Sequence, residues 1–130
     1  MSATAPARPH VLIAEDNELV CGAMRVLFEE TGHRVTIAPS IAATVAAAVA
    51  DPVDLLLLDL GLADGDGLLV LEQLRARGAF PTVSVALTGR DDPEIVATCL
   101  AAGCREVLLK PVPARTLLRK TREWLGDRER

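Results

Sequence analysis

Apolar runs that end in a polar residue recur along the chain. The clearest is Leu55–Leu58, which leads directly to Asp59 and is followed by a glycine-rich segment. A run of this length before glycines is typical of a buried parallel strand that ends in a loop. Three other runs end in the same way, and their polar ends are Glu15 with Asp16, Thr88, and Lys110.

Strand-like segments alternate five times with helix-like segments. The expected strands are 10–14, 33–38, 53–58, 82–87 and 105–109, and the expected helices are about 18–31, 40–50, 67–78, 92–102 and 113–125. Alternation with short connections is typical of an α/β fold, in which a parallel sheet lies between two layers of helices. We therefore expect one domain over 10–125, with short tails at 1–9 and 126–130.

Residues with strong end preferences stand near the expected helix ends. Ser40 and Asp92 are placed to cap the second and fourth helices, and Pro93 suits a first helical turn. Glycines occupy the positions that follow three helices, namely Gly32, Gly78 and Gly103. The last helix carries one apolar face, made of Leu117, Thr121, Trp124 and Leu125, which predicts packing against the sheet.

The composition predicts a compact domain with an aliphatic core. Half of the 130 residues are hydrophobic and only 2% are aromatic. The net charge is -4, but residues 110–130 hold seven basic and three acidic side chains. We interpret these cations as the solvent-facing side of the last helix, because no aromatic residues that could stack on bases are interleaved with them. Direct contact with nucleic acid is not expected.

The cysteines and the apolar stretches indicate the cellular compartment. Cys21, Cys99 and Cys104 form an odd set without metal-ligand spacing, which favours small core groups in a reducing cytoplasm over disulfides or a metal site. The first residues lack the apolar region of a signal peptide, and no apolar stretch reaches membrane-spanning length. We expect a cytoplasmic protein without a membrane contact.

The polar strand ends predict a phosphoryl-transfer site. The carboxyl ends of parallel strands meet at one edge of a sheet, where open α/β folds bind ligands. Glu15, Asp16 and Asp59 would repel one another there unless a cation joins them, and oxygen ligands suit Mg²⁺. Thr88 adds a hydroxyl group and Lys110 an ammonium group. A carboxylate nucleophile with these groups is suited to accepting a phosphoryl group.

With these residues the chain resembles the receiver domain of two-component response regulators, from about His10 to Leu125. The matching segments are VLIAEDN, LLLLDL, the Gly65-Asp66-Gly67 turn, ALTG and the Lys110-Pro111 pair. The resemblance implies a flavodoxin-like (βα)5 three-layer sandwich with a five-stranded parallel sheet in the order 2-1-3-4-5. The segments EDN and AAGC are similar to those of receivers in hybrid histidine kinases.

The resemblance also implies a phosphoacceptor and a metal site. Asp59 would take a phosphoryl group from a phosphohistidine of a histidine kinase or a histidine phosphotransfer protein. Asp16 and Asp59 would ligate Mg²⁺, with Glu15 acting through water and the Gly61 carbonyl as a further ligand. Such a domain catalyses its own phosphorylation and dephosphorylation and is not otherwise an enzyme.

The remaining implied roles lie on the last two strands. Thr88 and Lys110 would bind the phosphoryl oxygens, and the peptide bond between Lys110 and Pro111 would be cis. Many receivers carry Tyr or Phe where this chain has Val107, three residues before Lys110. The switch that couples a moving Thr88 to that ring cannot operate in its usual form here, so a muted change on that face is expected.

Two further departures from the family pattern concern the metal side of the site. Leu62 and Ala63 replace the Met-Pro that often follows the phosphoacceptor, which predicts a less rigid loop without loss of a ligand. Glu15 replaces the commoner Asp, and this variation is frequent.

Three alternative functions fit these residues less well. A phosphatase resembling the haloacid dehalogenases needs an Asp two residues after the nucleophile, where this chain has Gly61. A degenerate receiver that acts as a phosphate-independent interaction module is disfavoured because Asp16, Asp59, Thr88 and Lys110 are all present. An EF-hand in the segment DGDG lacks liganding acids at the required offsets.

Overall fold

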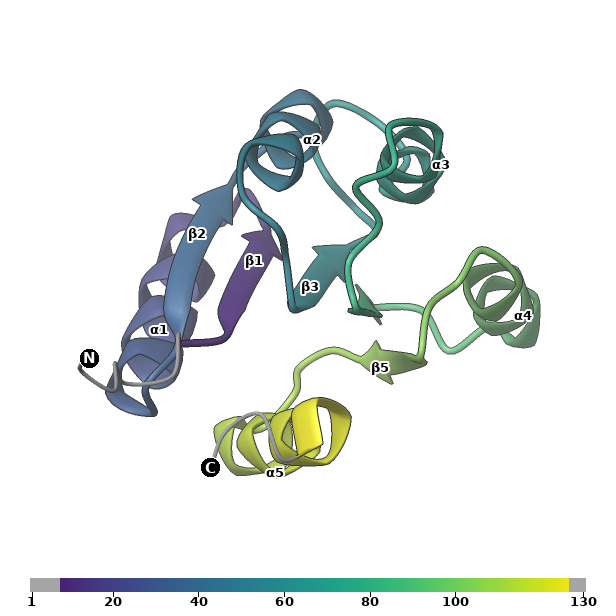
Figure 1. Cartoon of the computed structure of the whole chain (residues 1–130). Helices are drawn as coiled ribbons and strands as arrows, with labels where there is room; N and C mark the ends of the chain where they lie inside the picture. Colours follow the sequence, from purple (N-terminus) through teal and green to yellow (C-terminus); the bar gives the residue numbers. More distant parts are fainter. Residues whose placement is uncertain (1–7, 127–130) are drawn as a thin grey trace.

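Strands and helices alternate along the chain in a computed structural model that describes residues 8–126 (Figure 1). The strands are β1 (His10–Ala14), β2 (Arg34–Ala38), β3 (Leu55–Asp59), β4 (Val83–Thr88) and β5 (Glu106–Leu109). The helices are α1 (Glu18–Glu30), α2 (Ile41–Ala50), α3 (Leu68–Ala76), α4 (Pro93–Ala101) and α5 (Ala114–Leu125). The predicted tails lie largely outside the described residues.

The strands form a parallel sheet, and within residues 8–126 its order is β2-β1-β3-β4-β5. The α/β fold and the implied strand order are therefore confirmed. Two predicted strand ends fall one residue short, because Asp59 pairs with Leu87 and Thr88 pairs with Leu109 inside the ladder. These two functional candidates thus have backbones held by the sheet itself rather than by a loop.

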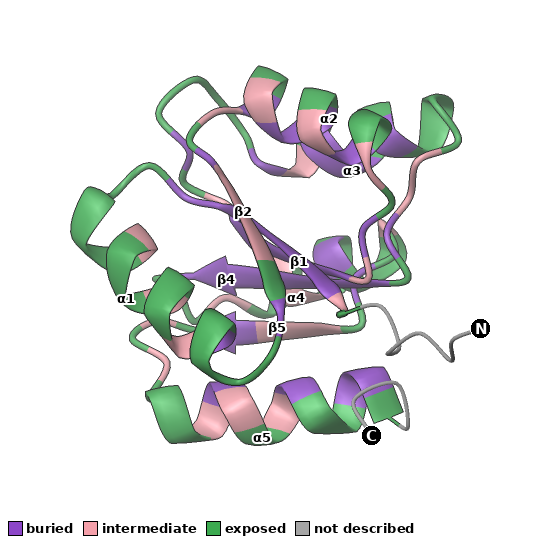
Figure 2. Cartoon of the chain, turned by 60° about the vertical axis from the view of Figure 1, so that its left-hand side comes forward, coloured by how far each residue is buried: buried purple, intermediate pink, exposed green. Residues whose placement is uncertain are grey.

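Helices cover both faces of the sheet. Alternate strand residues face α2, α3 and α4 on one side, as Leu12, Leu56 and Leu58 do, and together with those helices they form one core cluster. The other side packs against α1 and α5, with Phe28 and Leu117 among the buried residues. The central strands are buried on both faces and are bounded by the two helical layers (Figure 2). This explains the unbroken apolar runs, because a parallel strand covered on both sides has no polar face.

The predicted capping residues and end glycines act as expected, although the helices are one to three residues shorter than predicted. The Ser40 hydroxyl accepts a hydrogen bond from the Ala43 backbone N–H at 3.0 Å, and the Asp92 carboxylate accepts one from Glu94 at 2.9 Å. Three glycines have positive φ after their helices, namely Gly32 (88°), Gly78 (67°) and Gly103 (110°). Residues with a Cβ adopt such angles at a cost, so these positions end the helices.

The last helix packs as its pattern predicts. Leu117, Thr121, Trp124 and Leu125 are buried. Its basic side chains lie on the other side of the helix, where Arg119 is 61% exposed, while Lys120 forms an ion pair with Glu106 of β5. No helix in the described part of the chain is long and apolar enough to cross a membrane.

Candidate functional site

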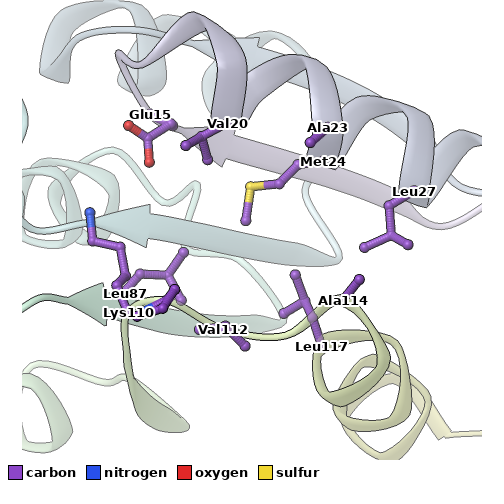
Figure 3. A pocket seen from close by; sticks show the side chains of 11 residues that line it. Glu15, Val20, Ala23, Met24, Leu27, Leu87, Lys110, Val112, Ala114 and Leu117 are labelled. Atoms are coloured by element: carbon purple, nitrogen blue, oxygen red, sulfur yellow. The ribbon is translucent and has the colours of Figure 1, made fainter.

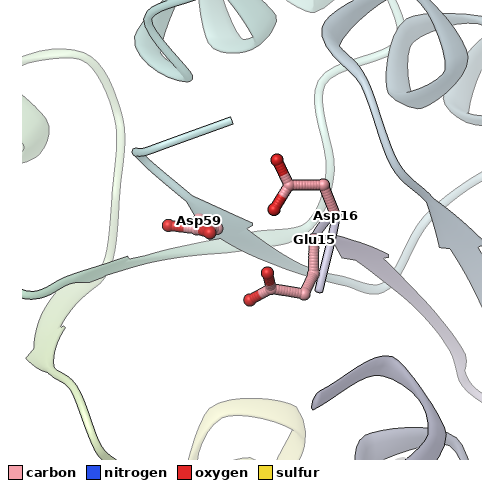
Figure 4. A group of neighbouring side chains, drawn as sticks. All are labelled: Glu15, Asp16 and Asp59. Carbon is pink, nitrogen blue, oxygen red and sulfur yellow. The ribbon is translucent and has the colours of Figure 1, made fainter. Parts of the chain in front are cut away.

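Three carboxylates meet at the carboxyl edge of the sheet (Figure 4). Glu15 and Asp16 directly follow β1, and Asp59 is the last residue of β3, the neighbouring strand. Each side chain offers one oxygen, and these oxygens all lie within 4.8 Å of one another. Glu15 and Asp59 are each 4% exposed, whereas Asp16 is exposed.

The two carboxylate oxygens of Asp59 differ in their hydrogen bonding. Its Oδ1 accepts hydrogen bonds from the Lys110 ammonium group and from the Gly61 backbone N–H, each at 3.0 Å. No hydrogen bond reaches Oδ2 within residues 8–126. Lys110 therefore balances the charge of Asp59 on one side and leaves the second oxygen open.

The surroundings of Glu15 disfavour its ionised form. Burial raises the pKa of its carboxyl group, and the charges of Asp59 and Asp16 raise it further. The Asn17 backbone N–H, which donates to Oε2 at 3.0 Å, lowers the pKa, as does Lys110. The net rise means that the folded protein disfavours the ionised form of Glu15, and a cation between the three acids would relieve this cost.

Asp16 bonds to the loop that follows β3. Its Oδ2 accepts a hydrogen bond from the Ala63 backbone N–H at 2.9 Å. The same loop passes close to the end of β3 at Gly67, where a Cβ would lie 2.8 Å from the Asp59 carbonyl oxygen. Real Cβ atoms do not approach a backbone oxygen so closely, so only glycine fits at this position.

Thr88 and Lys110 lie at the ends of β4 and β5. Thr88 is 6% exposed, and its Oγ1 accepts a hydrogen bond from the Arg90 backbone N–H at 3.1 Å. The Lys110 backbone N–H donates to the Thr88 carbonyl at 2.7 Å, which ties the two strand ends together. The Lys110–Pro111 peptide bond is cis, the conformation that the resemblance implies.

Two hollows adjoin this edge of the sheet. A groove of about 730 Å³ runs from Asp59, Gly61, Thr88 and Lys110 towards the start of α4. A second hollow of about 530 Å³ lies between α1 and α5, with Glu15 and Lys110 at one end and apolar side chains such as Met24 along it (Figure 3). The polar cluster thus lies where a polar groove and an apolar groove meet.

Val107 lies on β5, next to this edge. It pairs with Ala86 of β4, is half-buried, and packs against the core on the α2, α3 and α4 side. Glu106, the residue before it, accepts hydrogen bonds from Lys120 and from the Trp124 indole N–H of α5. The strand that carries Val107 is therefore fastened to α5.

The structure places the three acids, Gly61, Thr88 and Lys110 at this edge, whereas Val107 lies within β5. The three acids cluster, Lys110 contacts Asp59, and Thr88 lines the same groove. Sequence reasoning missed the Ala63 N–H that bonds to Asp16 and the close approach at Gly67. The only signal for the first was that Ala63 stands where the receiver pattern described above has a proline, which has no N–H to donate.

The donor set fits a magnesium ion. Three carboxylate oxygens from two adjacent strand ends converge, and one side of the cluster is exposed through Asp16, which leaves room for water and phosphate oxygens. Mg²⁺ is usually held by one or two carboxylates together with waters and substrate phosphates.

Comparisons with known proteins agree on one family. The family model described as "Response regulator receiver domain" matches residues 11–122. The chain is 34% identical over 102 residues to the KDP operon transcriptional regulatory protein KdpE of Escherichia coli, covering 78% of this chain and 44% of that protein. It is 33% identical over 111 residues to the sensory/regulatory protein RpfC of Xanthomonas campestris, covering 83% of this chain and 15% of that one.

A solved structure extends the likeness to the whole fold. The receiver domain of a sensor histidine kinase from Pseudomonas aeruginosa, solved with a magnesium ion coordinated in its active site cleft, superposes with a TM-score of 0.82 and 27% identity. The match covers 93% of this chain and all of that domain. This chain spans less than half the length of the two curated relatives above.

Proposed function

Because the chain belongs to the response regulator receiver domain family of two-component signalling, we propose that Asp59 is its phosphoacceptor. In this proposal a histidine kinase or a histidine phosphotransfer protein supplies the phosphoryl group from a phosphohistidine. The receiver unit spans 10–125 and works in the cytoplasm. It catalyses only the gain and loss of its own phosphoryl group.

The open oxygen of Asp59 is the observation that carries the proposal. Lys110 and Gly61 both bind Oδ1, so the carboxylate is fixed in orientation while Oδ2 has no partner within residues 8–126. Asp59 lines the polar groove of about 730 Å³, which is large enough for an incoming phosphoryl group. A nucleophile that is positioned in advance and accessible on one side suits an in-line attack.

The transfer exchanges one bond for another. An Asp59 oxygen forms a bond to phosphorus while the bond from phosphorus to the histidine nitrogen breaks, and the imidazole leaves with the electron pair. The Lys110 ammonium group can then pair with a phosphoryl oxygen. The Thr88 hydroxyl accepts from Arg90 and retains its own hydrogen to donate to a second oxygen.

The acids would hold the magnesium ion that such a transfer uses. Asp16 and Asp59 would ligate it directly, Glu15 through water, and the Gly61 carbonyl would be a further ligand. When bound, the ion neutralises charge on the phosphoryl oxygens. The support for this set is the convergence of three carboxylate oxygens within 4.8 Å, together with the raised pKa of Glu15.

The partner would dock over the apolar groove between α1 and α5. That groove begins at Glu15 and Lys110, so a protein seated on it would face the phosphoacceptor. On α1, Leu19 and Val26 are 86% and 54% exposed, and large exposed apolar side chains next to such a groove favour a protein contact. A helical histidine-bearing domain with an apolar face fits this surface.

Intact mass after incubation with acetyl phosphate and Mg²⁺ tests the phosphoacceptor. The wild-type protein should gain one phosphoryl group, and Asp59→Asn should gain none. Asp66→Asn is a matched control, because Asp66 is an exposed acid in the following loop that caps the Leu68 N–H. Undiminished labelling of Asp59→Asn would show that the acceptor is another residue.

A further inference from the structure

Besides the bond from the Leu60 backbone N–H to the Leu87 carbonyl, two carboxylate contacts attach the loop between β3 and α3 to other parts of the described chain. At the first, the Ala63 backbone N–H donates to Asp16 Oδ2 at 2.9 Å, across 47 residues of sequence. At the second, the Asp64 carboxylate accepts from the Ile41 backbone N–H, with both of its oxygens at 3.0 to 3.1 Å. Consecutive residues of the loop thus contact Asp16 on one side and the start of α2 on the other.

The attachment to α2 is firm. Ile41 is the first residue of that helix, and the Ser40 hydroxyl caps the same turn through Ala43. The loop also packs closely there, since a Cβ on Gly65 would lie 3.3 Å from the Ile41 side chain. Ile41 itself is buried in the core. The position of Ala63 is therefore set by a helix end that cannot shift without disturbing packed residues.

Asp16 needs such support more than the other two acids do. Glu15 and Asp59 are buried and have donors of their own, whereas Asp16 is exposed. An exposed carboxylate samples several rotamers and must give up that freedom when it binds an ion. Carboxylates that ligate metals are commonly held in place by hydrogen bonds, and losing such a partner weakens metal binding.

We propose that the Ala63 backbone N–H, fixed through the contact between Asp64 and Ile41, is a positioning group that orients the Asp16 carboxylate for Mg²⁺. The bond occupies Oδ2 and leaves Oδ1 and a further lone pair for the ion. A proline at position 63 could not make this bond to Asp16, because proline has no backbone N–H. The inference rests on the proposed function, since it assumes that Asp16 is a metal ligand.

Two substitutions at Asp64 separate hydrogen bonding from charge. Asp64→Ala and Asp64→Asn remove the same negative charge, but the Asn carbonyl can still accept from Ile41. We expect Asp64→Ala to raise the dissociation constant for Mg²⁺ at least threefold above that of Asp64→Asn, measured by titrating backbone amide shifts with MgCl₂. Equal constants for the two variants would overturn the proposal.

Ala63→Pro tests the donor directly, with Ala63→Gly as the variant that keeps the N–H. We expect Ala63→Pro to bind Mg²⁺ at least threefold more weakly than Ala63→Gly, and equal or tighter binding would overturn the proposal. Should Ala63→Pro fail to fold, the linkage is tested instead by hydrogen exchange of the two Asp64 variants without metal. Asp64→Ala should then speed the exchange of the Ala63 amide at least tenfold relative to Asp64→Asn, and an unchanged rate contradicts the linkage.

Asp16→Ala distinguishes failure of this inference from failure of the function proposed above. If Asp16→Ala binds Mg²⁺ like the wild type, Asp16 is not a ligand and the metal site itself is wrong. If Asp16→Ala binds weakly while the Asp64 and Ala63 variants do not differ within their pairs, only the positioning role is wrong.

Discussion

The Lys110 ammonium group lies 3.0 Å from Asp59 Oδ1, although 51 residues separate the two in sequence. The contact joins the ends of β3 and β5, which are not neighbours in the sheet because β4 lies between them. A long side chain is needed to span that strand. Lysine provides this reach together with a point charge that can turn towards a phosphoryl oxygen.

Lys110→Met should slow phosphorylation by acetyl phosphate by at least tenfold. The methionine retains much of the side-chain volume but removes the charge that would face the phosphoryl oxygens, and single donors to a developing oxyanion are worth roughly 10² to 10³ in rate. The measurement is the rate of phosphoryl gain by intact mass at saturating Mg²⁺. Arg119→Met, on the exposed side of α5, is the control and should leave the rate unchanged. Equal rates for Lys110→Met and the wild type would exclude Lys110 from the transfer.

Glu15→Gln should stabilise the metal-free protein at pH 7. Burial raises the pKa of Glu15 above its ordinary value of 4.5, so the folded state binds this proton more tightly than the unfolded state. Stability is therefore lost as the pH rises from about 4.5 through the folded pKa, and Gln avoids that loss. We expect this gain in stability to appear as a higher Tm at pH 7 in thermal melts without metal.

The pH dependence provides the control for Glu15→Gln. Near pH 4 the wild-type carboxyl is largely protonated in both states, so the two proteins should melt at similar temperatures. Saturating Mg²⁺ at pH 7 should reduce the gain, because the ion stabilises the ionised wild type. A gain that is as large at pH 4 as at pH 7 would show that the charge of Glu15 is not its cause.

Gly67→Ala should strongly destabilise the protein, by about 2 kcal/mol or more. The added Cβ would lie 2.8 Å from the Asp59 carbonyl oxygen and 3.0 Å from the Leu60 Cα, and both are backbone atoms at the site. Gly22→Ala is a control that should change the stability in the opposite direction. It lies inside α1 with no atom within 4 Å of its added Cβ, so it should stabilise the helix by roughly 0.5 to 1 kcal/mol. Urea denaturation of both variants decides, and a neutral Gly67→Ala would contradict the close approach.

Ser84→Ala should stabilise the protein by about 1 kcal/mol. Ser84 lies on β4, is 1% exposed, and its hydroxyl has no hydrogen-bond partner within residues 8–126. A buried polar group without a partner costs free energy that an apolar side chain of similar size does not. Thermal melts give the comparison, and Thr44→Ala serves as the contrast because the Thr44 hydroxyl bonds to the Ser40 carbonyl at 2.7 Å. A loss of stability in Ser84→Ala would mean that the hydroxyl is satisfied.

Much of the fold follows from the sequence because its signals are local. The apolar runs mark strands that are covered on both faces, and residues such as Ser40 and Gly32 act within a single turn of chain. The strand ends were less predictable, since Asp59 and Thr88 are polar and only their ladder partners show that they continue β3 and β4. The pattern could not show which neighbouring backbone a strand end would meet.

The candidate site also has features that the sequence predicts and features that it does not. The topology of a parallel sheet is enough to bring the acids, Thr88 and Lys110 to one edge. The contact between Asp16 and Ala63, however, depends on the path of a loop and on one rotamer. The residue type at position 63 shows only that an N–H is available there, not where that N–H points. The apolar groove between α1 and α5 is also a property of two helices that cover the same face of the sheet, and neither helix predicts it alone.

The last prediction concerns how far a signal spreads from Asp59. A phosphoryl group adds roughly -1.5 to -2 charge at neutral pH, and in the proposed function Thr88 and Lys110 would donate hydrogen bonds to its oxygens. In receivers with an aromatic residue at the position of Val107, an inward movement of the threonine makes room for the ring to turn. Val107 is too small to fill such a space, and it is already packed against core residues next to Ala86. On the other side, Glu106 holds Lys120 and Trp124 of α5, which ties β5 to that helix.

We therefore expect beryllofluoride with Mg²⁺ to change the loops around Asp59 and Thr88 while leaving residues 92–109 nearly unchanged. Backbone amide shifts in NMR spectra of the free and bound protein give the measurement. Val107→Tyr should enlarge the shifts in α4 and β5, because it supplies a ring that can follow Thr88, while Val107→Ile should behave like the wild type. Such a receiver would suit the passage of a phosphoryl group along a relay, because the proposed partner would need only the site and the adjacent α1–α5 groove. Shifts across 92–109 in the wild type as large as those in the Asp59 and Thr88 loops would show that the switch operates without a ring.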